Sequence, residues 1–308
     1  MVLEKFLKEL ADGAKPPKYA DLLKLSGLAP EELEPFRRVW SATLPVELKR
    51  DILARLVELS EENVDADFAA VFRHCLADPD QGVREKAVLG LWECDDRTLI
   101  APLIDLLCHD ASEAVRAAAA MTLGKFAYLA ETGKILARDG ARICEALVGV
   151  IERNNESLEV RRRALEAVGY FSSPKVSELV RGAYESGHAK LRHSAVYAMG
   201  RNCDPQWLPV ILQELRSQDP LMRYEAASAC REMGEEDAVP HLVPLTQDED
   251  SQVQLAAITA LGVIGGGLAK KALLRCARSP DDVVREAAEV ALEAAEMEDG
   301  PVAFKFNV

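Results

Sequence analysis

Aromatic residues are scarce in this chain of 308 residues: they make up 6% of it, although hydrophobic residues make up 49%. The apolar surplus lies in Ala, Leu and Val, a mixture that favours closely packed helices over sheets. No stretch approaches the roughly 18 uninterrupted apolar residues of a membrane span. The first residues, MVLEKFLKELADG, place charges among the apolar residues, which is unlike a signal peptide. We therefore expect a soluble, cytoplasmic protein without a membrane partner.

Positive charge is also in short supply. The formal net charge is -14 and the pI is near 5.0. Neutralisation of phosphates supplies much of the affinity for nucleic acids, so a nucleic-acid partner is disfavoured. The seven cysteines form no CxxC pair and are odd in number, which excludes the usual disulfide frameworks and zinc modules. We expect reduced cysteines that lie in the core.

Short catalytic and metal-binding motifs are missing. The five histidines are scattered and form no HExxH or comparable ligand pair. The segment GVIGGGLAKK at 262–271 lacks the GxxxxGK[ST] pattern of a phosphate loop and falls where the chain is expected to turn between helices. No nucleophile and base stand at a diagnostic spacing. The sequence therefore predicts no catalytic residue, no metal and no cofactor.

What the chain does have is an internal repeat. An apolar residue, Arg, two further residues and then Ala recur seven times, with Gln in place of Arg once. The last five copies follow one another at intervals of 31 residues, and an interval of 45 residues separates the second copy from the third. Such regular spacing indicates a tandem array. The second residues of the seven copies are Arg84, Arg116, Arg161, Arg192, Arg223, Gln254 and Arg285.

Each unit of the repeat predicts two helices. Apolar or small residues stand one before, three after and seven after the Arg position, a spacing that lays one stripe along a helix. Turn-forming and helix-starting residues stand six positions before it. These are Asp78, Asp110, Asn155, Ser186, Ser217, Asp248 and Ser279. A hairpin of this kind buries its apolar face only by stacking on its neighbours.

The repeat resembles the HEAT repeats, through proline in the first helix (Pro102, Pro209 and Pro240), Asp in the turn and Arg early in the second helix. Its length and VRxxAAxALG wording are most similar to the short HEAT-like repeats named after phycobilin lyases. The resemblance implies an all-α, right-handed α-solenoid of stacked antiparallel helix hairpins. It also implies a structural ladder that joins adjacent hairpins, with Gln254 as an uncharged rung. The ladder residues are Arg84, Arg116, Arg161, Arg192, Arg223, Arg285, Asp78, Asp110 and Asp248.

The resemblance divides the chain into three parts. Residues 1–61 are expected to form an N-terminal helical cap with a degenerate first hairpin, and residues 62–297 an array of about seven units. Residues 298–308 form a tail in which Val302, Phe304, Phe306 and Val308 alternate as in a strand. The tail is expected to fold back over the last hairpin, or else to add a strand to a partner. The extra residues of the long interval fall near 127–141, as a lengthened helix with a solvated loop or as a loop that overhangs one face.

Two departures from the repeat mark a candidate binding surface. Residues 160–201 carry eight basic residues against three acidic ones, which favours an acidic partner. Three tyrosines step by four positions along successive second helices and are expected to form a stripe on the concave surface. The alternative is that they are half-buried packing residues. The candidate residues are Arg162, Arg163, Tyr170, His193, Tyr197, Arg201 and Tyr224.

These features together lead to a functional hypothesis. We expect a non-enzymatic scaffold that binds another protein or a peptide segment on its concave helix surface. One alternative is a bilin-lyase-like protein that handles a tetrapyrrole, and a weaker one is a nucleic-acid-binding solenoid. Di-iron hydroxylases of this architecture carry His-Glu pairs on several repeats, whereas this sequence contains no HE dipeptide.

Overall fold

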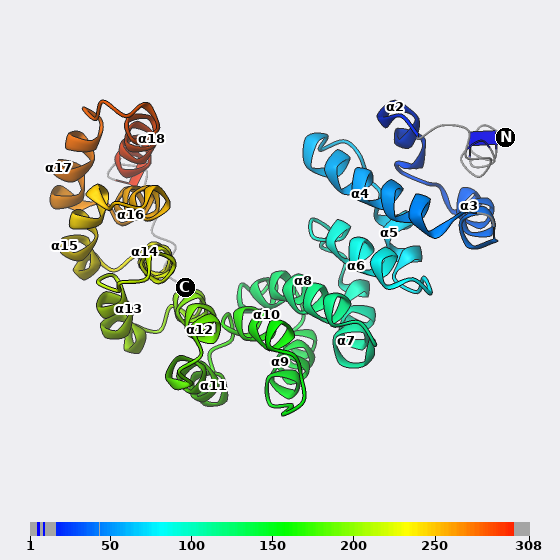
Figure 1. Ribbon diagram of the computed structural model, residues 1–308, viewed down its shortest axis with the longest axis horizontal. Coiled ribbons are helices and arrows are strands. Elements are labelled where there is room, and N and C mark those ends of the chain that lie inside the picture. The colour runs from blue at the N-terminus through cyan, green and yellow to red at the C-terminus, as the bar shows by residue number, and fades with distance from the viewer. Residues whose placement is uncertain (1–4, 7–8, 10–16, 43, 299–308) are drawn as a thin grey trace. The chain divides into compact units, whose positions relative to one another are not determined.

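The protein is all-helical, as the computed structural model shows (Figure 1). The structure describes residues 5–6, 9, 17–42 and 44–298, and no strand is present among them. The predicted fold class, an α-solenoid of stacked antiparallel hairpins, is confirmed. The tail predicted to alternate as a strand lies outside the described residues, from 299 onward. The chain divides into two compact units, residues 1–167 and 168–308, and each is described by itself.

The first unit begins with short elements and continues as hairpins. Its α-helices are α2 (Tyr19–Leu22), α3 (Pro30–Ala42), α4 (Val46–Glu62), α5 (Ala69–Cys75), α6 (Gln81–Gly90), α7 (Ile100–His109), α8 (Glu113–Glu131), α9 (Ala137–Ile151) and α10 (Leu158–Val168), whose last residue already belongs to the second unit. Its 3₁₀ helices are η1 (Leu23–Leu25) and η2 (Arg97–Leu99).

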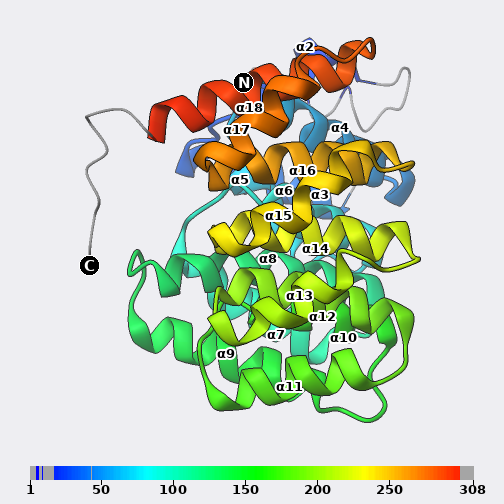
Figure 2. The ribbon, with the colours of Figure 1, turned by 90° about the vertical axis from the view of Figure 1, so that its left-hand side faces the viewer.

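The second unit is a stack of four hairpins, which Figure 2 shows as successive rows. Its α-helices are α11 (Pro174–Glu185), α12 (Ala189–Asn202), α13 (Leu208–Glu214), α14 (Pro220–Met233), α15 (Val239–Leu242), α16 (Ser251–Ile264), α17 (Gly266–Cys276) and α18 (Asp282–Glu298). Its 3₁₀ helices are η3 (Pro205–Trp207), η4 (Glu236–Ala238) and η5 (Val243–Gln247).

The turn residues of the repeat start each second helix. In the turn before α16, a side-chain oxygen of Asp248 accepts a hydrogen bond from the backbone amide of Asp250 at 2.9 Å. Asp250 in turn caps α16 and accepts from the amides of Gln252 and Val253. Asp78 and Asp80 repeat this arrangement before α6. The caps from Asp80 and Asp250 satisfy backbone amides that the first turn of a helix leaves without an intrahelical partner.

The second helices pack closely because glycine recurs eight positions after the repeat Arg. A Cβ atom added at Gly200 would stand 2.7 Å from the Cα atom of Ala229 on the next second helix. The same contact recurs along the array, always between a glycine and an alanine of the following unit. The pairs are Gly124 with Ala167, Gly169 with Ala198, Gly200 with Ala229, and Gly262 with Ala291. Small residues therefore set the distance between neighbouring hairpins.

The long interval of the repeat mainly lengthens a helix. The helix α8 continues to Glu131, and α9 begins at Ala137. Gly133, with a φ of 70°, lies in the short turn between them. Of the extra residues predicted near 127–141, most are helical, which matches the lengthened-helix interpretation rather than an overhanging loop.

The repeat arginine joins two successive turns. Nη1 of Arg84 donates to the main-chain oxygen of Asp78 in its own turn, at 2.9 Å. Its Nε and Nη2 atoms donate to the carboxylate of Asp110 in the next turn, at 2.7 and 2.8 Å. Arg223 makes the same fork with Asp248, at 2.8 and 2.7 Å. These bidentate pairs tie each hairpin to its neighbour with fixed geometry.

Other ladder arginines have partners that differ from the turn residue predicted for them. Arg116 forms its fork with Glu156, at 2.7 Å for the shortest bond. Arg192 donates to Glu214 on the first helix of the next hairpin, at 3.0 Å, because the turn of that unit offers serine instead of aspartate. The buried carboxylate of Glu214 also accepts from the hydroxyl of Tyr184.

The remaining rungs are weaker or local. Arg285 pairs with Asp282 of its own helix. Gln254 donates from its side-chain amide to the main-chain oxygen of Thr246, at 2.7 Å, and is uncharged as expected. The Nε atom of Arg161 is buried and has no hydrogen-bond partner within the part of the chain that the structure describes.

Asp78 belongs to a buried polar cluster instead of an arginine rung. Its carboxylate accepts from Nζ of Lys49 at 2.9 Å and from the indole nitrogen of Trp40 at 3.3 Å. The Lys49 and Asp78 side chains are 6% and 4% exposed. This cluster joins α3 and α4 to the turn before α6.

Acid is expected to destabilise the folded protein through its ion-paired aspartates. The hydrogen bond from Arg50 lowers the pKa of Asp80 to about 2, and the one from Arg223 lowers the pKa of Asp248. The folded pKa values lie below the value of about 3.9 in an unfolded chain, so this stabilisation is complete above about pH 4 and is lost as the pH falls towards about 2. Thermal unfolding followed by circular dichroism at a series of pH values measures this loss.

The variant Arg50→Gln should reduce the loss of melting temperature with acid. An Arg38→Gln variant, changed at an exposed position on α3, serves as the control and should retain the full acid dependence. An acid dependence that is the same in all three proteins would contradict the assignment.

Candidate functional site

Three of the residues predicted to form a binding surface come together in the second unit. The guanidinium of Arg201 lies over the rings of Tyr197, at 5.0 Å from the ring centroid, and Tyr170, at 5.7 Å. Its Nη1 atom donates to Glu232 at 2.8 Å. Cation–π contacts on two rings and a carboxylate hold this guanidinium in one place.

A small pocket of 220 Å³ lies beside Arg201, between α12 and α14. The third tyrosine of the predicted stripe, Tyr224, forms part of its wall and is 36% exposed. The lining residues are Tyr197, Arg201, Tyr224, Glu225, Ser228, Ala229, Arg231 and Glu232. The stripe thus ends in a hollow with aromatic and charged walls.

His193 lies below the surface instead of on it. The residue is 9% exposed, and its Nε2 atom is 2.7 Å from the carboxylate of Asp219, which caps α14. Burial acts to raise the pKa of Asp219, but the hydrogen bonds from His193 and from the backbone amide of Leu221 lower it. The position joins two hairpins and does not face the pocket beside Arg201.

The two arginines that follow Arg161 are paired within their own helix. Arg162 contacts Glu159 at 2.7 Å and Glu166 at 3.5 Å. Arg163 contacts the same two carboxylates, each at 3.0 Å. Pairs three and four residues apart share one face of a helix, so the three consecutive arginines do not form an exposed basic patch.

A further groove in the second unit was not predicted from the sequence. It has a volume of 760 Å³ and lies between α11 and the connection from α12 to α13. This volume lies within the range of about 300–1,000 Å³ that is usual for ligand sites. We name it the α11 groove, and its lining residues are Ser172, Ser173, Pro174, Ser177, Glu178, Arg181, Gly182, Glu185, Asn202, Asp204 and Gln206.

Carboxylates dominate the charge of the α11 groove. Glu178, Glu185 and Asp204 line it against one cation, Arg181, and Lys175 pairs with Glu178 at 3.5 Å from outside the lining. That guanidinium is already engaged, because it lies 5.1 Å from the ring centroid of Trp207 and donates to Gln206 at 3.2 Å. The groove therefore offers more negative charge than it neutralises.

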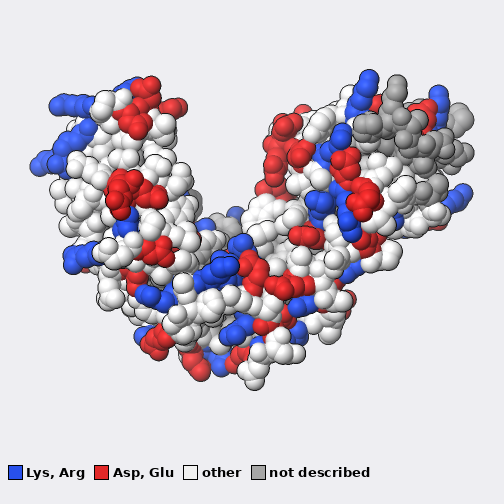
Figure 3. Space-filling view, viewed as in Figure 1, with Lys and Arg blue, Asp and Glu red and all other residues white. Residues whose placement is uncertain are grey.

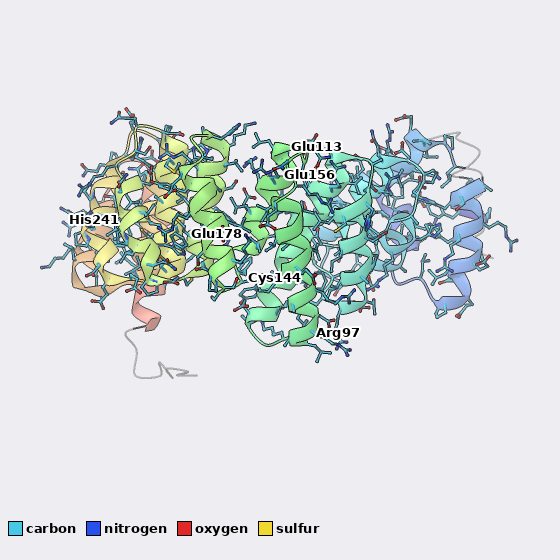
Figure 4. The ribbon with its side chains drawn as sticks, turned by 90° about the horizontal axis from the view of Figure 1, so that it is seen from below. Arg97, Glu113, Cys144, Glu156, Glu178 and His241 are labelled. Atoms are coloured by element: carbon cyan, nitrogen blue, oxygen red, sulfur yellow. The ribbon has the colours of Figure 1, made fainter. Side chains whose placement is uncertain are left out.

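The next hairpin repeats the groove with different chemistry. A hollow of 460 Å³ lies between α13 and α15, and it is lined by the exposed Arg216 and the half-buried His241, whose side-chain nitrogens are 3.3 Å apart. Its one carboxylate, Glu214, is buried in the rung described above. Figure 4 marks Glu178 on α11 and His241 on α15. Both hairpins therefore have a groove at the same place in the repeat, but the charged residues that line it differ between the two units.

The sequence does carry a signal for the α11 groove. Within SSPKVSELVRGAYESG, polar residues recur at helical spacing as Ser177, Glu178, Arg181 and Glu185. A polar stripe of this kind is normally a solvated face. The opposite wall comes from the following turn, and the spacing within one helix does not reveal it.

The cysteines are all free. Cys75, Cys230 and Cys276 are buried, and burial raises the pKa of the Cys230 thiol to about 12. Cys94, Cys108 and Cys144 are half-buried, while Cys203 is exposed. Cys108, which was predicted to lie in the core, is thus only half-buried.

The described residues show no cluster of the side chains that usually hold a metal ion. Among them, no group of three or more His, Cys, Asp or Glu side chains is arranged to hold one. The histidines are separated and have other partners: His109 pairs with Asp105, and His74 packs edge-on against Phe36. In the same part of the chain, no helix is both long and apolar enough to cross a membrane.

The stacked hairpins, their Arg–carboxylate rungs and their glycine–alanine contacts define an α-solenoid. The profile of the HEAT repeats matches residues 69–139 and 208–293, about half of the chain. The chain belongs to the HEAT-repeat family. A narrower membership in the phycobilin-lyase type of repeat is not supported, because the curated relatives have another function.

Among curated proteins, the deoxyhypusine hydroxylase of Drosophila melanogaster is 30% identical over 119 residues, which cover 38% of this chain and 39% of the relative. The structure of human deoxyhypusine hydroxylase in complex with glycerol is 21% identical and covers 87% of this chain and 97% of the human chain, with a TM-score of 0.39. In a Kap95:Nup1 complex, the matched chain is 14% identical, with a TM-score of 0.52, and the match covers 94% of this chain and 46% of that one. This chain thus spans about two fifths of the length of the fly hydroxylase.

These comparisons correct the functional hypothesis. The expectation of a non-enzymatic scaffold is wrong, because the curated relatives are enzymes, the deoxyhypusine hydroxylases. The two alternatives, a bilin-lyase-like protein and a nucleic-acid-binding solenoid, are not favoured either. The His-Glu pairs of di-iron hydroxylases are absent from this sequence, and the separated histidines do not fit a di-iron centre.

Proposed function

We propose that this chain recognises a protein side chain that ends in protonated amines, the class to which deoxyhypusine belongs. The observation that carries the proposal is the similarity to deoxyhypusine hydroxylase over 119 residues. Deoxyhypusine is a lysine side chain lengthened by an aminobutyl group, so it carries two amines. Alkyl amines of this kind are protonated near neutral pH.

The α11 groove has the charge that such a side chain requires. Glu178 and Glu185 stand seven residues apart on α11, which is about two turns, so they follow one another along the same helix face. Two separated amines of one ligand would pair with two separated carboxylates, and Asp204 adds negative charge on the opposite wall. Arg181 does not compete, since Trp207 and Gln206 hold it, but an amine of the ligand would have to displace the exposed Lys175 from Glu178.

The proposal concerns recognition and derives no chemical step. The residues described do not fit the di-iron centre of hydroxylases with this architecture, so no hydroxylation is routed through them. The role of this chain's own residues is to bind and orient the amines by charge.

A binding titration tests the proposal. A fluorescent peptide that contains deoxyhypusine should bind the full chain more tightly than the same peptide with unmodified lysine. The double variant Glu178→Gln/Glu185→Gln should weaken binding of the deoxyhypusine peptide by about tenfold, which corresponds to about 1.4 kcal/mol.

The matched control is Glu286→Gln/Glu289→Gln, which makes the same charge change on the exposed face of α18. This variant should bind like the wild type. Equal affinity for the two peptides, or an equal loss in both double variants, would overturn the proposal.

A further inference from the structure

The pocket beside Arg201 is chemically unlike the α11 groove. Its walls combine two tyrosine rings with two guanidinium groups, those of Arg201 and Arg231. The pocket lies between the second helices α12 and α14, whereas the α11 groove lies along a first helix. The residues of the two sites do not overlap, so a function of this pocket is independent of the function proposed above.

Arg201 is organised to bind an anion. Its guanidinium is fixed against Tyr170 and Tyr197 before any ligand arrives. A planar guanidinium with five N–H donors matches the planar fork of a carboxylate. Preorganisation lowers the entropy that is lost when a ligand binds, so a held arginine binds better than a mobile one.

Glu232 positions a second guanidinium beside the first. One of its carboxylate oxygens accepts from Arg201 at 2.8 Å, and the other accepts from Arg231 at 2.7 Å. With Glu225, which also lines the pocket, two carboxylates balance the two guanidinium groups. Each guanidinium has five N–H donors, which is more than its hydrogen bond to Glu232 uses.

The helix α12 carries Lys190, Arg192 and Arg201 and no acidic residue. This stands out in a chain whose formal net charge is -14. Because Glu214 and Glu232 neutralise Arg192 and Arg201, a carboxylate would be bound through the remaining N–H donors of the guanidinium groups and not through a net positive charge.

The geometry points to a single carboxylate as the occupant: we propose that the pocket beside Arg201 binds an acidic side chain of a peptide. A volume of 220 Å³ suits a group of that size. Glu225 and Glu232 also line the pocket, and they repel a doubly charged phosphate more strongly than a singly charged carboxylate. The exposed ring of Tyr224 provides an apolar wall for the stem of the side chain.

Binding of a fluorescent hexaglutamate peptide to the full chain tests this proposal. We expect saturable binding that weakens as salt is added, and no binding of the corresponding hexalysine peptide to this pocket. Arg201→Gln and, separately, Tyr224→Ser should each weaken binding of hexaglutamate by several-fold to about tenfold. Arg278→Gln, which removes an exposed arginine outside the pocket, should have no effect.

Melting curves of the variants separate a binding defect from misfolding. Tyr224→Ser is the safer variant, since its ring is already partly exposed. Unchanged binding in a folded Tyr224→Ser and a folded Arg201→Gln would overturn the proposal. Competition by inorganic phosphate as strong as that by glutamate would also overturn it, because the site would then be a phosphate site.

Discussion

Asp78→Ala is expected to reduce the free energy of unfolding of the first unit by about 3–5 kcal/mol, the usual cost of leaving one charge of a buried pair without its partner. The Lys49 ammonium is only 6% exposed and donates to Asp78 at 2.9 Å. The substitution would also remove the acceptor of the Trp40 indole nitrogen. Urea unfolding followed by tryptophan fluorescence measures the effect, because Trp40 reports on this cluster.

A double variant provides the control for this result. Lys49→Met/Asp78→Leu removes both charges and replaces them with apolar side chains, so it should recover much of the lost stability. If Asp78→Ala alone cost less than about 1 kcal/mol, a value typical of an exposed pair, the buried pair would not stabilise this unit as argued.

Gly200→Ala is expected to destabilise the second unit by about 1–3 kcal/mol, although alanine is the better helix former. The new methyl group would stand 2.7 Å from the Cα atom of Ala229 and 2.8 Å from its Cβ atom. Backbone atoms do not move aside as a flexible side chain does, so α12 and α14 would have to separate. The midpoint of thermal unfolding should therefore fall.

The matched control is Gly149→Ala on α9. No atom lies within 4 Å of the Cβ position there, and the residue is exposed. This substitution should stabilise its helix by up to about 1 kcal/mol. The opposite signs of the two effects test whether glycine sets the spacing of the second helices. A stabilising Gly200→Ala would show that it does not.

The hairpins were predictable because the same pattern of apolar, turn and Arg residues, with Gln in place of Arg once, recurs in every unit of the repeat. The stripe of Val160, Ala164 and Val168 is fully buried, as its helical spacing predicts. The sequence contains the glycine eight positions after the repeat Arg, but it does not show why a larger residue is excluded there. Only the structure shows that this glycine meets an alanine of the next unit.

The carboxylate that pairs with each ladder arginine could not be predicted from the repeat pattern alone. Arg192 pairs with Glu214 because its neighbouring turn has serine instead of aspartate, and the replacement comes from a first helix. Similarly, Arg162 and Arg163 appeared to be surplus positive charge until Glu159 and Glu166 were found on the same helix face. Local charge counts do not show which carboxylate faces which cation.

The candidate sites were predicted only in part. Tyr170, Tyr197 and Arg201 lie together and their role in binding stays a prediction, whereas His193 lies below the surface against Asp219. The α11 groove was missed because its two walls belong to different hairpins. The similarity to deoxyhypusine hydroxylase was missed as well, since the His-Glu pairs that would have indicated it are absent.

Photo-cross-linking tests the proposed recognition most directly. A peptide that carries deoxyhypusine next to a photoreactive residue would be irradiated with the full chain, and the attached residues would be located by mass spectrometry. The account predicts cross-links to α11 and to residues 202–206, and far fewer with the lysine peptide. Cross-links that lie elsewhere, or that form equally with both peptides, would contradict it.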